Sequence, residues 1–462
     1  MVRAATAAQS TTGARWAQQL GPKLLLLTAG STLAATMKNG WRNSTSGLHT
    51  FGLWSVHEKG ANLSAFDFVW SLEFADLPVF RPSMPHAVLS RYVAFSLAPT
   101  QGQNLSWWQE HHPEWVLYQC DRKTPAAYWG TTIPLDVTNP DVLAWQLGGT
   151  DNPNSVDAIV AAGFDSISLD VFGWGNYGKA CGVYDSAGKW KQLYSGDVDT
   201  DPKYAAGVDR WLKAFYAGLR KRVLFIINFS SNPGAEPTCP TCLPTSLAWD
   251  AERTLFVGNH SDGALSESGF TNFGSNVTTG DAWENRLQFM RHMQWAGKYY
   301  ADTSYWGPLN VHSKQKIDPE RWGAVLDYII GSWMLGNEGL SSVFVGPNDC
   351  AAPYLQPNGD CVFPGWKGNM QNYSQFSAPI GTPLGTAQKG KVGDGCGSIW
   401  HREYTTAVVF LNPSLANQSC MVDLDTSMWE YSRLDGTAFR QATAMVHSAS
   451  AVVLLRAPKA PA

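Results

Sequence analysis

The stretch Ala161-Ala-Gly-Phe-Asp-Ser-Ile-Ser-Leu-Asp170 decides the fold that we expect for this chain. It predicts a helix end, a turn at glycine and a short apolar strand that stops at a carboxylate. A strand that is buried on both faces is typical of a parallel sheet. An acid at the carboxyl end of such a strand is typical of the active-site mouth of a (β/α)8 barrel. Alternatively, Asp170 accepts a backbone hydrogen bond or caps the next segment.

Outward from this stretch, one unit of apolar strand, polar loop and helix recurs along the chain. The expected strands are 50–54, 66–70, 92–96, the strand of the 161–170 stretch, 223–228, 263–267, 298–301 and 342–345. Eight such strands over about 300 residues match the size of a (β/α)8 TIM barrel. A doubly wound open sheet is the alternative, but it would normally have a glycine-rich phosphate turn, and the sequence has none.

The rest of the chain divides around a barrel predicted over 46–347. Residues 1–45 contain no acid and include the apolar run 24–27, so we expect a targeting segment there. It resembles an atypical signal peptide, with an organellar transit peptide as the alternative. Residues 348–385 are a loop-rich connection, and 386–457 predict a small C-terminal antiparallel, β-sandwich-like domain.

Composition narrows the class of protein. The net charge is -4 and no basic run occurs, which argues against a nucleic-acid partner. No segment of the mature chain is apolar for long enough to span a membrane. The 21 tryptophans favour surfaces that stack on sugar rings, although a large aromatic core also needs them. We expect a monomer.

Cysteines and glycosylation sequons predict a secreted or cell-surface glycoprotein with disulfide bonds. Cys120 and Cys181 follow neighbouring expected strands, and the sequence leaves their pairing open. Cys239-Pro-Thr-Cys242 stands without a second such pair and is interpreted as structural. Sequons begin at Asn43, Asn62, Asn104, Asn259, Asn276, Asn372 and Asn417.

Two acids at expected strand ends form the candidate catalytic pair. Asp170 follows the fourth strand and Glu267 the sixth, and two carboxylates with separated pKa values can cleave a glycosidic bond. A capping or salt-bridged acid is the alternative for Glu267. Asn228, between them in strand order, is expected to bind a sugar hydroxyl or to cap the following turn. Further candidate substrate-binding residues are Trp54, Trp70, Glu73, Tyr118, Asp121, Trp174, Tyr305 and Trp306.

Several short blocks resemble the endo-α-1,4-polygalactosaminidase-type glycoside hydrolases and their uncharacterised relatives. The paired strand signatures are 163–170 and 261–267, and further similar blocks are 112–115, 135–140, 269–274, 400–404 and 409–414. The resemblance implies that Asp170 is the nucleophile and Glu267 the acid/base. The long aromatic loop after Asp170 and the insertion at 239–244 depart from the family, so galactosaminan does not carry over as substrate.

The sequence therefore predicts a glycoside hydrolase that cleaves an α-linked poly- or oligosaccharide by a two-carboxylate, retaining mechanism. No metal or organic cofactor is expected, because no metal-ligand spacing occurs. The alternative is a catalytically inactive, lectin-like barrel that binds carbohydrate at the cell surface. The separation of the carboxyl groups bears on the mechanism: ~5–5.5 Å is typical of retention and ~6.5–9.5 Å of inversion.

Overall fold

The structure is a computed structural model of the 462-residue chain. It describes residues 48–53, 63–95, 102–128, 132–198, 201–219, 222–229, 251–267, 269–271, 277–305, 322–346, 367–368, 370–391, 398–415 and 418–459. The expected targeting segment 1–45, the candidates Trp54 and Trp306, and the 239–244 insertion lie outside the described residues.

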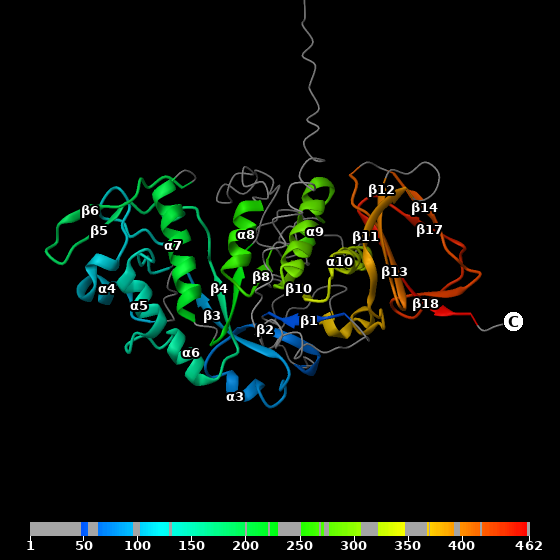
Figure 1. The fold of residues 1–462 in the computed structure, drawn as a ribbon, viewed down its shortest axis with the longest axis horizontal. Helices are drawn as coiled ribbons and strands as arrows, with labels where there is room; N and C mark the ends of the chain where they lie inside the picture. Colours follow the sequence, from blue (N-terminus) through cyan, green and yellow to red (C-terminus); the bar gives the residue numbers. More distant parts are fainter. Residues whose placement is uncertain are drawn as a thin grey trace, which may run out of the picture.

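Eight parallel strands close into a barrel in the order β1-β2-β3-β4-β7-β8-β9-β10 (Figure 1). They are β1 (Thr50–Gly52), β2 (Phe66–Leu72), β3 (Val88–Ala94), β4 (Ser166–Asp170), β7 (Leu224–Asn228), β8 (Gly263–Ser266), β9 (Tyr299–Tyr305) and β10 (Ser341–Gly346). The predicted (β/α)8 TIM barrel is confirmed. The third strand begins at Val88, before the predicted start at residue 92. The prediction missed its first residues because the polar Ser90 and Arg91 interrupt the apolar pattern, although both are buried.

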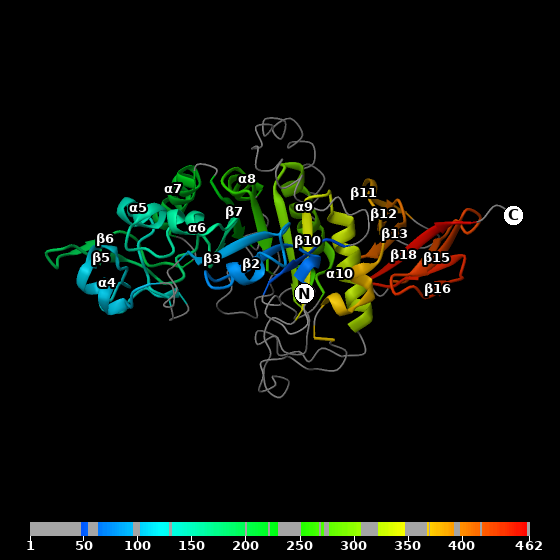
Figure 2. The same cartoon turned by 90° about the horizontal axis from the view of Figure 1, so that it is seen from below.

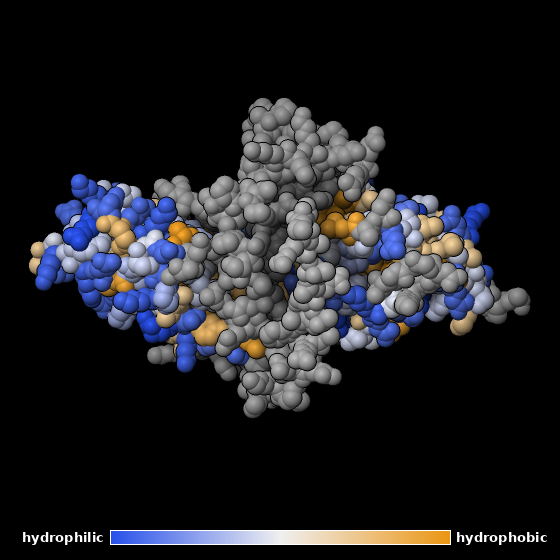
Figure 3. Space-filling view, turned by 90° about the horizontal axis from the view of Figure 1, so that it is seen from above, coloured by the Kyte–Doolittle hydropathy of each residue, from blue (hydrophilic) through white to orange (hydrophobic). Residues whose placement is uncertain are grey.

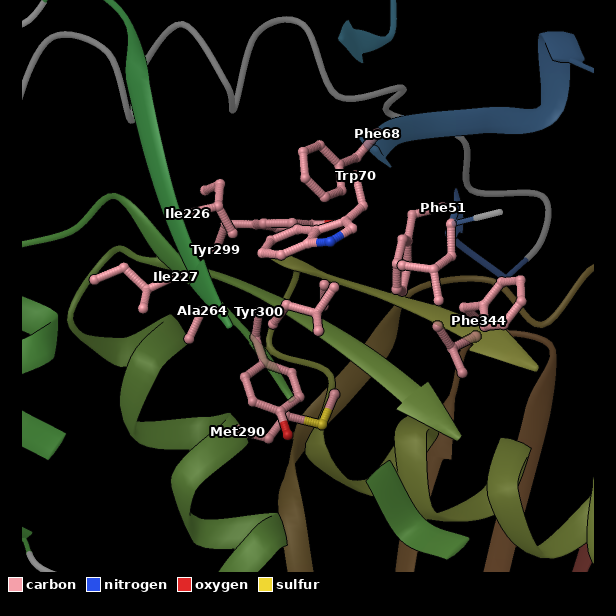
Figure 4. Packing of buried hydrophobic residues seen from close by; sticks show 14 of the residues in the cluster. Phe51, Phe68, Trp70, Ile226, Ile227, Ala264, Met290, Tyr299, Tyr300 and Phe344 are labelled. Atoms are coloured by element: carbon pink, nitrogen blue, oxygen red, sulfur yellow. The ribbon is translucent and has the colours of Figure 1, made fainter. Parts of the chain in front are cut away.

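Aromatic side chains fill the barrel interior. The rings of Phe68 and Tyr299 meet edge to face with centroids 5.2 Å apart, and Trp70 packs beside them (Figure 4). The next residue of β9, Tyr300, lies on the opposite face of the sheet against Phe289 and Met290. This alternation follows from the two-residue period of a strand, and it explains why both faces of β9 are buried.

Helices pack around the outside of the barrel. They are α3 (Leu77–Phe80), α5 (Pro140–Gly148), α6 (Val156–Ala162), α7 (Pro202–Leu219), α8 (Ala251–Asn259), α9 (Gly280–Trp295) and α10 (Trp322–Gly336). Local signals set their ends: Asn139 caps α5 by accepting the backbone N–H of Asp141 at 2.9 Å, and Pro140 occupies its first turn. No helix in the described ranges is long and apolar enough to cross a membrane.

The long connection from β3 to β4, together with a hairpin after β4, forms a lobe beside the barrel (Figure 1). It contains α4 (Leu105–His111) and the hairpin β5 (Gly182–Tyr184)–β6 (Trp190–Gln192). A disulfide joins Cys120 to Cys181 across 61 residues of sequence. Trp108, Trp115 and Trp145 form the centre of a second hydrophobic cluster in this lobe.

The C-terminal part is an antiparallel β domain, as predicted. Its main sheet has the order β11-β12-β13-β18-β15-β16, and β14 pairs with β17 in a second sheet. The strands are β11 (Pro383–Lys391), β12 (Ser398–Tyr404), β13 (Ala407–Asn412), β14 (Cys420–Asp423), β15 (Trp429–Arg433), β16 (Ala438–Phe439), β17 (Thr443–Val446) and β18 (Ser450–Pro458). The main sheet packs on α10, and the Tyr404 hydroxyl donates to the Met334 carbonyl at 2.6 Å (Figure 2).

The described surface is mainly hydrophilic at both ends of the elongated molecule (Figure 3). One of these ends is the β3–β4 lobe and the other is the C-terminal domain.

Candidate active site

The 161–170 stretch places Asp170 at the carboxyl end of β4. Gly163 ends α6 with a φ of 92°, a left-handed conformation that glycine adopts without steric cost. Asp165 then accepts the backbone N–H of Leu89 at 2.9 Å, which anchors the start of β4 to β3. Beyond Asp170, Val171 has a φ of 58°, which is unusual for a β-branched residue. The chain therefore turns abruptly just after the carboxylate.

Asp170 and Glu267 lie close together because both contact one side chain. The amide nitrogen of Asn228 donates to Oδ1 of Asp170 at 2.8 Å and to Oε2 of Glu267 at 2.8 Å. A carboxamide nitrogen has two hydrogens, so it can make both bonds at once. The two oxygens cannot be further apart than twice this N–O distance. For these two oxygens, that limit is ~5.6 Å.

Two tyrosine hydroxyls occupy the outer sides of the pair. Tyr92, on β3, donates to Oδ2 of Asp170 at 2.7 Å. Tyr305, at the end of β9, donates to Oε1 of Glu267 at 3.0 Å. Each of the four carboxylate oxygens thus accepts a hydrogen bond from the protein.

The electrostatics distinguish Glu267 within the pair. Burial, followed by the nearby charge of Asp170, raises the pKa of Glu267 to about 7, although the bonds from Asn228 and Tyr305 act in the opposite direction. Burial and the charge of Asp170 also raise the pKa of Tyr92 above its ordinary value. Tyr92 is therefore a hydrogen-bond donor at neutral pH. Glu267 is poised to hold or release a proton there.

The other sequence candidates that the structure describes make their contacts elsewhere. Trp70 is 2% exposed in the barrel interior. Trp174 is also buried, and its indole N–H donates to Asp209 at 2.6 Å. Glu73 pairs with Arg91 at 2.8 Å. In the β3–β4 lobe, Tyr118 accepts from Gln109, and Asp121 accepts from Thr124 at an exposed turn.

Sequence reasoning missed Tyr92. The available signal was the two-residue period of β3, which places the side chains of Ser90 and Tyr92 on one face. On that face, Ser168 of β4 donates to Ser90 at 2.6 Å. Tyr92 stands two residues further along β3 and opposite Ser168 in the register, so its side chain shares that face and reaches Asp170. The described residues contain no group of three or more His, Cys, Asp or Glu side chains placed to hold a metal ion.

No protein-family model matches the chain, and no curated protein sequence matches it. Among solved structures, it is similar to a family 39 glycoside hydrolase from Bacteroides cellulosilyticus WH2, with a TM-score of 0.47, 12% identity, and coverage of 89% of this chain and 81% of that one. It is also similar to an alpha-amylase from Lactobacillus plantarum, with a TM-score of 0.42, 12% identity and coverage of 89% of each chain. For an alpha-amylase from Geobacillus thermoleovorans, the TM-score is 0.43, the identity is 9%, and the alignment covers 90% of this chain and 99% of that one. Likenesses this distant do not assign an activity to the chain.

Proposed function

We propose that the chain is a glycoside hydrolase whose catalytic pair is Asp170 and Glu267. The observation that supports this most is the contact of both carboxylates with the single amide nitrogen of Asn228, at 2.8 Å each. Glycosidic cleavage needs two carboxyl groups that flank one bond at a fixed separation and differ in protonation. A pair at the ends of β4 and β8, in the barrel mouth, has this form.

The short separation favours retention of configuration. An inverting enzyme places a water between its second carboxylate and the sugar, which requires roughly 6.5–9.5 Å between the carboxyl groups. Two hydrogen bonds of 2.8 Å from one nitrogen keep the bonded oxygens of Asp170 and Glu267 within ~5.6 Å of each other, which supports the shorter separation that is typical of retention. Retention proceeds instead through a covalent glycosyl-enzyme intermediate.

Each carboxyl group has a distinct role in this mechanism. Glu267, with its pKa raised to about 7, donates a proton to the leaving glycosidic oxygen as that bond breaks. Asp170, held by Tyr92 and Asn228, attacks the anomeric carbon and forms an ester. Glu267 then takes a proton from water, the hydroxyl attacks the anomeric carbon, and Asp170 leaves as a carboxylate. The α-linkage of the substrate rests on the sequence resemblance to polygalactosaminidase-type enzymes.

The experiment is a hydrolysis screen on α-linked oligosaccharides, with Asp170→Asn and Glu267→Gln as the site variants. For any substrate cleaved by the parent, proton NMR of the first product reports its anomeric configuration. We expect the α-anomer to appear first, before mutarotation. Initial release of the β-anomer would reject retention, and unchanged rates in both variants would reject the catalytic pair.

A carbohydrate-binding protein without activity is the second candidate. One observation favours it: all four carboxylate oxygens of Asp170 and Glu267 accept hydrogen bonds from Tyr92, Asn228 and Tyr305. A fully bonded network of this kind also suits a structural role. In this case the chain binds glycans, and no substrate in the screen is cleaved by the parent protein.

A further inference from the structure

We propose that a groove on the outer side of strand β3 is a second sugar-binding site. The groove has a volume of about 430 Å³, within the size range of small-molecule sites. The segment after β2 contributes Glu73, β3 contributes Arg91, and the segment before α6 contributes Asn154. Helix α4 contributes Trp107. The site therefore combines an aromatic side chain with charged and amide groups from four parts of the chain.

Arg91 fixes the polar floor of this groove. Its guanidinium is 2% exposed, lies 2.8 Å from Oε2 of Glu73, and donates to Oδ1 of Asn154 at 2.7 Å. It also donates to the Leu72 carbonyl at 2.9 Å. Because the buried cation holds both partners, the Glu73 carboxylate and the Asn154 amide keep a fixed spacing. Glu73 is 64% exposed, and a carboxylate accepts several hydrogen bonds, so it can also accept sugar hydroxyls.

Trp107 provides the flat apolar wall. The His111 ring stacks on it, with centroids 4.4 Å apart and planes 9° from parallel, and Trp108 packs edge-on at 4.9 Å. Asn104 caps the helix by accepting the backbone N–H of Trp107 at 2.9 Å. The indole is thus held in one orientation but is only partly buried. The C–H face of a pyranose is apolar, so it gains by covering such a ring.

The charges of the groove select the kind of sugar. Glu73 neutralises Arg91, and the exposed Asp151 adds a further negative charge to the lining. An acidic sugar would meet carboxylates of the same sign, which disfavours its binding. The ligand class is therefore a neutral or amino pyranose within a glycan chain.

The groove is distinct from the carboxyl pair. Arg91 and Tyr92 are consecutive residues of β3, so their side chains lie on opposite faces of the barrel wall. Tyr92 bonds Asp170 on the inner face, while Arg91 bonds Asn154 on the outer face. The groove shares with the proposed function only the expectation that the chain binds carbohydrate, and it does not require the pair to be catalytic.

The test measures binding to the full-length chain with Asp170→Asn and Glu267→Gln in place, so that a bound glycan is not consumed. The probes are maltoheptaose, a chitosan hexamer and an oligogalacturonate, in titration calorimetry. We expect one of the first two to bind, and Trp107→Ala to weaken its binding by about tenfold or more. Glu73→Gln should also weaken it. The control is Trp295→Ala, because Trp295 is 45% exposed on α9, away from the groove.

Two results would overturn the groove as a site: no binding of either non-acidic probe, or equal binding by the background protein and by both groove variants. Preferred binding of the oligogalacturonate would overturn the ligand class. Should Trp107→Ala unfold, Glu73→Gln decides, because Glu73 is exposed. Trp107-dependent binding without any hydrolysis by the parent would reject the hydrolase and keep the groove. Hydrolysis with groove-independent binding would do the reverse.

Discussion

Asp170 and Glu267, which are 97 positions apart in sequence, accept hydrogen bonds of 2.8 Å from the same nitrogen of Asn228. The barrel makes this possible, because β4, β7 and β8 are consecutive strands and end side by side. Asn228 ends the middle strand and lies between the two acids. The ends of three neighbouring strands therefore bring the two carboxyl groups together.

The raised pKa of Glu267 predicts how activity depends on pH. The protonated form donates to the leaving group, so kcat/KM should fall as the pH rises through about 7. The measurement is a pH–rate profile on a substrate whose leaving group needs a proton. With an activated aryl leaving group, the alkaline fall should be weaker. An alkaline limb near pH 4.5, the ordinary value for a glutamate, would contradict this account.

The same pKa predicts the pH dependence of stability. Because the folded-state pKa is raised, the folded chain binds the proton more tightly than the unfolded chain between pH 4.5 and about 7. The free energy of unfolding should therefore fall as the pH rises through this window. This pH dependence is absent in Glu267→Gln. Between pH 4.5 and 8, the free energy of unfolding of the variant should therefore rise by up to about 3 kcal/mol relative to that of the parent. Denaturant unfolding at both pH values measures the difference.

Asn228→Ala should impair catalysis through both carboxylates. The variant loses the donor that lowers the pKa of Glu267, so the alkaline limb of the pH–rate profile should move upward. Loss of the bridge should also reduce kcat by about 10–100-fold, since it costs about 1.5–3 kcal/mol for bonds to charged groups. Tyr305→Phe is the comparison variant: it removes another donor that lowers the pKa of Glu267, so its alkaline limb should also move upward, while the bond from Asn228 to Asp170 remains. An unchanged profile in Asn228→Ala would argue against the bridge.

Tyr92→Phe tests the orientation of Asp170. The hydroxyl donates at 2.7 Å to the oxygen opposite the one that Asn228 binds. Without it we expect kcat to fall by about tenfold, with KM little changed, because the lost bond orients the nucleophile and does not hold the sugar. Steady-state kinetics on one α-linked substrate separate these quantities. A rise in KM alone would make Tyr92 a substrate-binding residue.

We expect Arg402 to stabilise the contact between the barrel and the C-terminal sheet. It is 2% exposed, donates to the Asn337 carbonyl at 2.6 Å and pairs with Glu338 at 3.0 Å. Arg402→Ala leaves Arg291 as the cation paired with Glu338 and removes the donor to the Asn337 and Gly385 carbonyls, so it should cost about 3–5 kcal/mol of unfolding free energy. Lys389→Ala breaks the exposed pair with Glu284 and should cost less than about 1 kcal/mol. Equal losses in the two variants would contradict this ranking.

The barrel was predictable because each strand contains a short apolar run, although the ends of several strands differ from the predicted ones. The acids were found because they stand just after such runs. Side-chain direction was harder to obtain. Strand β2 continues past Trp70 to Leu72, so Trp70 belongs to the buried interior rather than to the mouth. Strand ends inferred from hydropathy are uncertain by a few residues, and a shift of one residue turns a side chain to the other face.

Partners in space also depended on the register between strands. Glu73 follows β2, but Arg91 on the neighbouring strand holds it at the outer wall. The Arg91 contact has no signature in the sequence, and the period of β3 indicates only the face on which Tyr92 lies. Its contact with Asp170 depends on which residues stand side by side across strands. The pairing of Cys120 with Cys181 also depends on contacts between segments that are far apart in the sequence, so the sequence alone does not determine it.

The kcat/KM of Asp170→Asn and Glu267→Gln on an α-linked oligosaccharide cleaved by the parent tests the central claim most directly. Both side chains keep their shape and lose their charge or proton, so circular dichroism should show an unchanged fold. We expect each variant to lose about a thousandfold or more, and azide to restore turnover when Asp170 is replaced by alanine. Hydrolysis by both variants at the parent rate would contradict the assignment of the carboxyl pair.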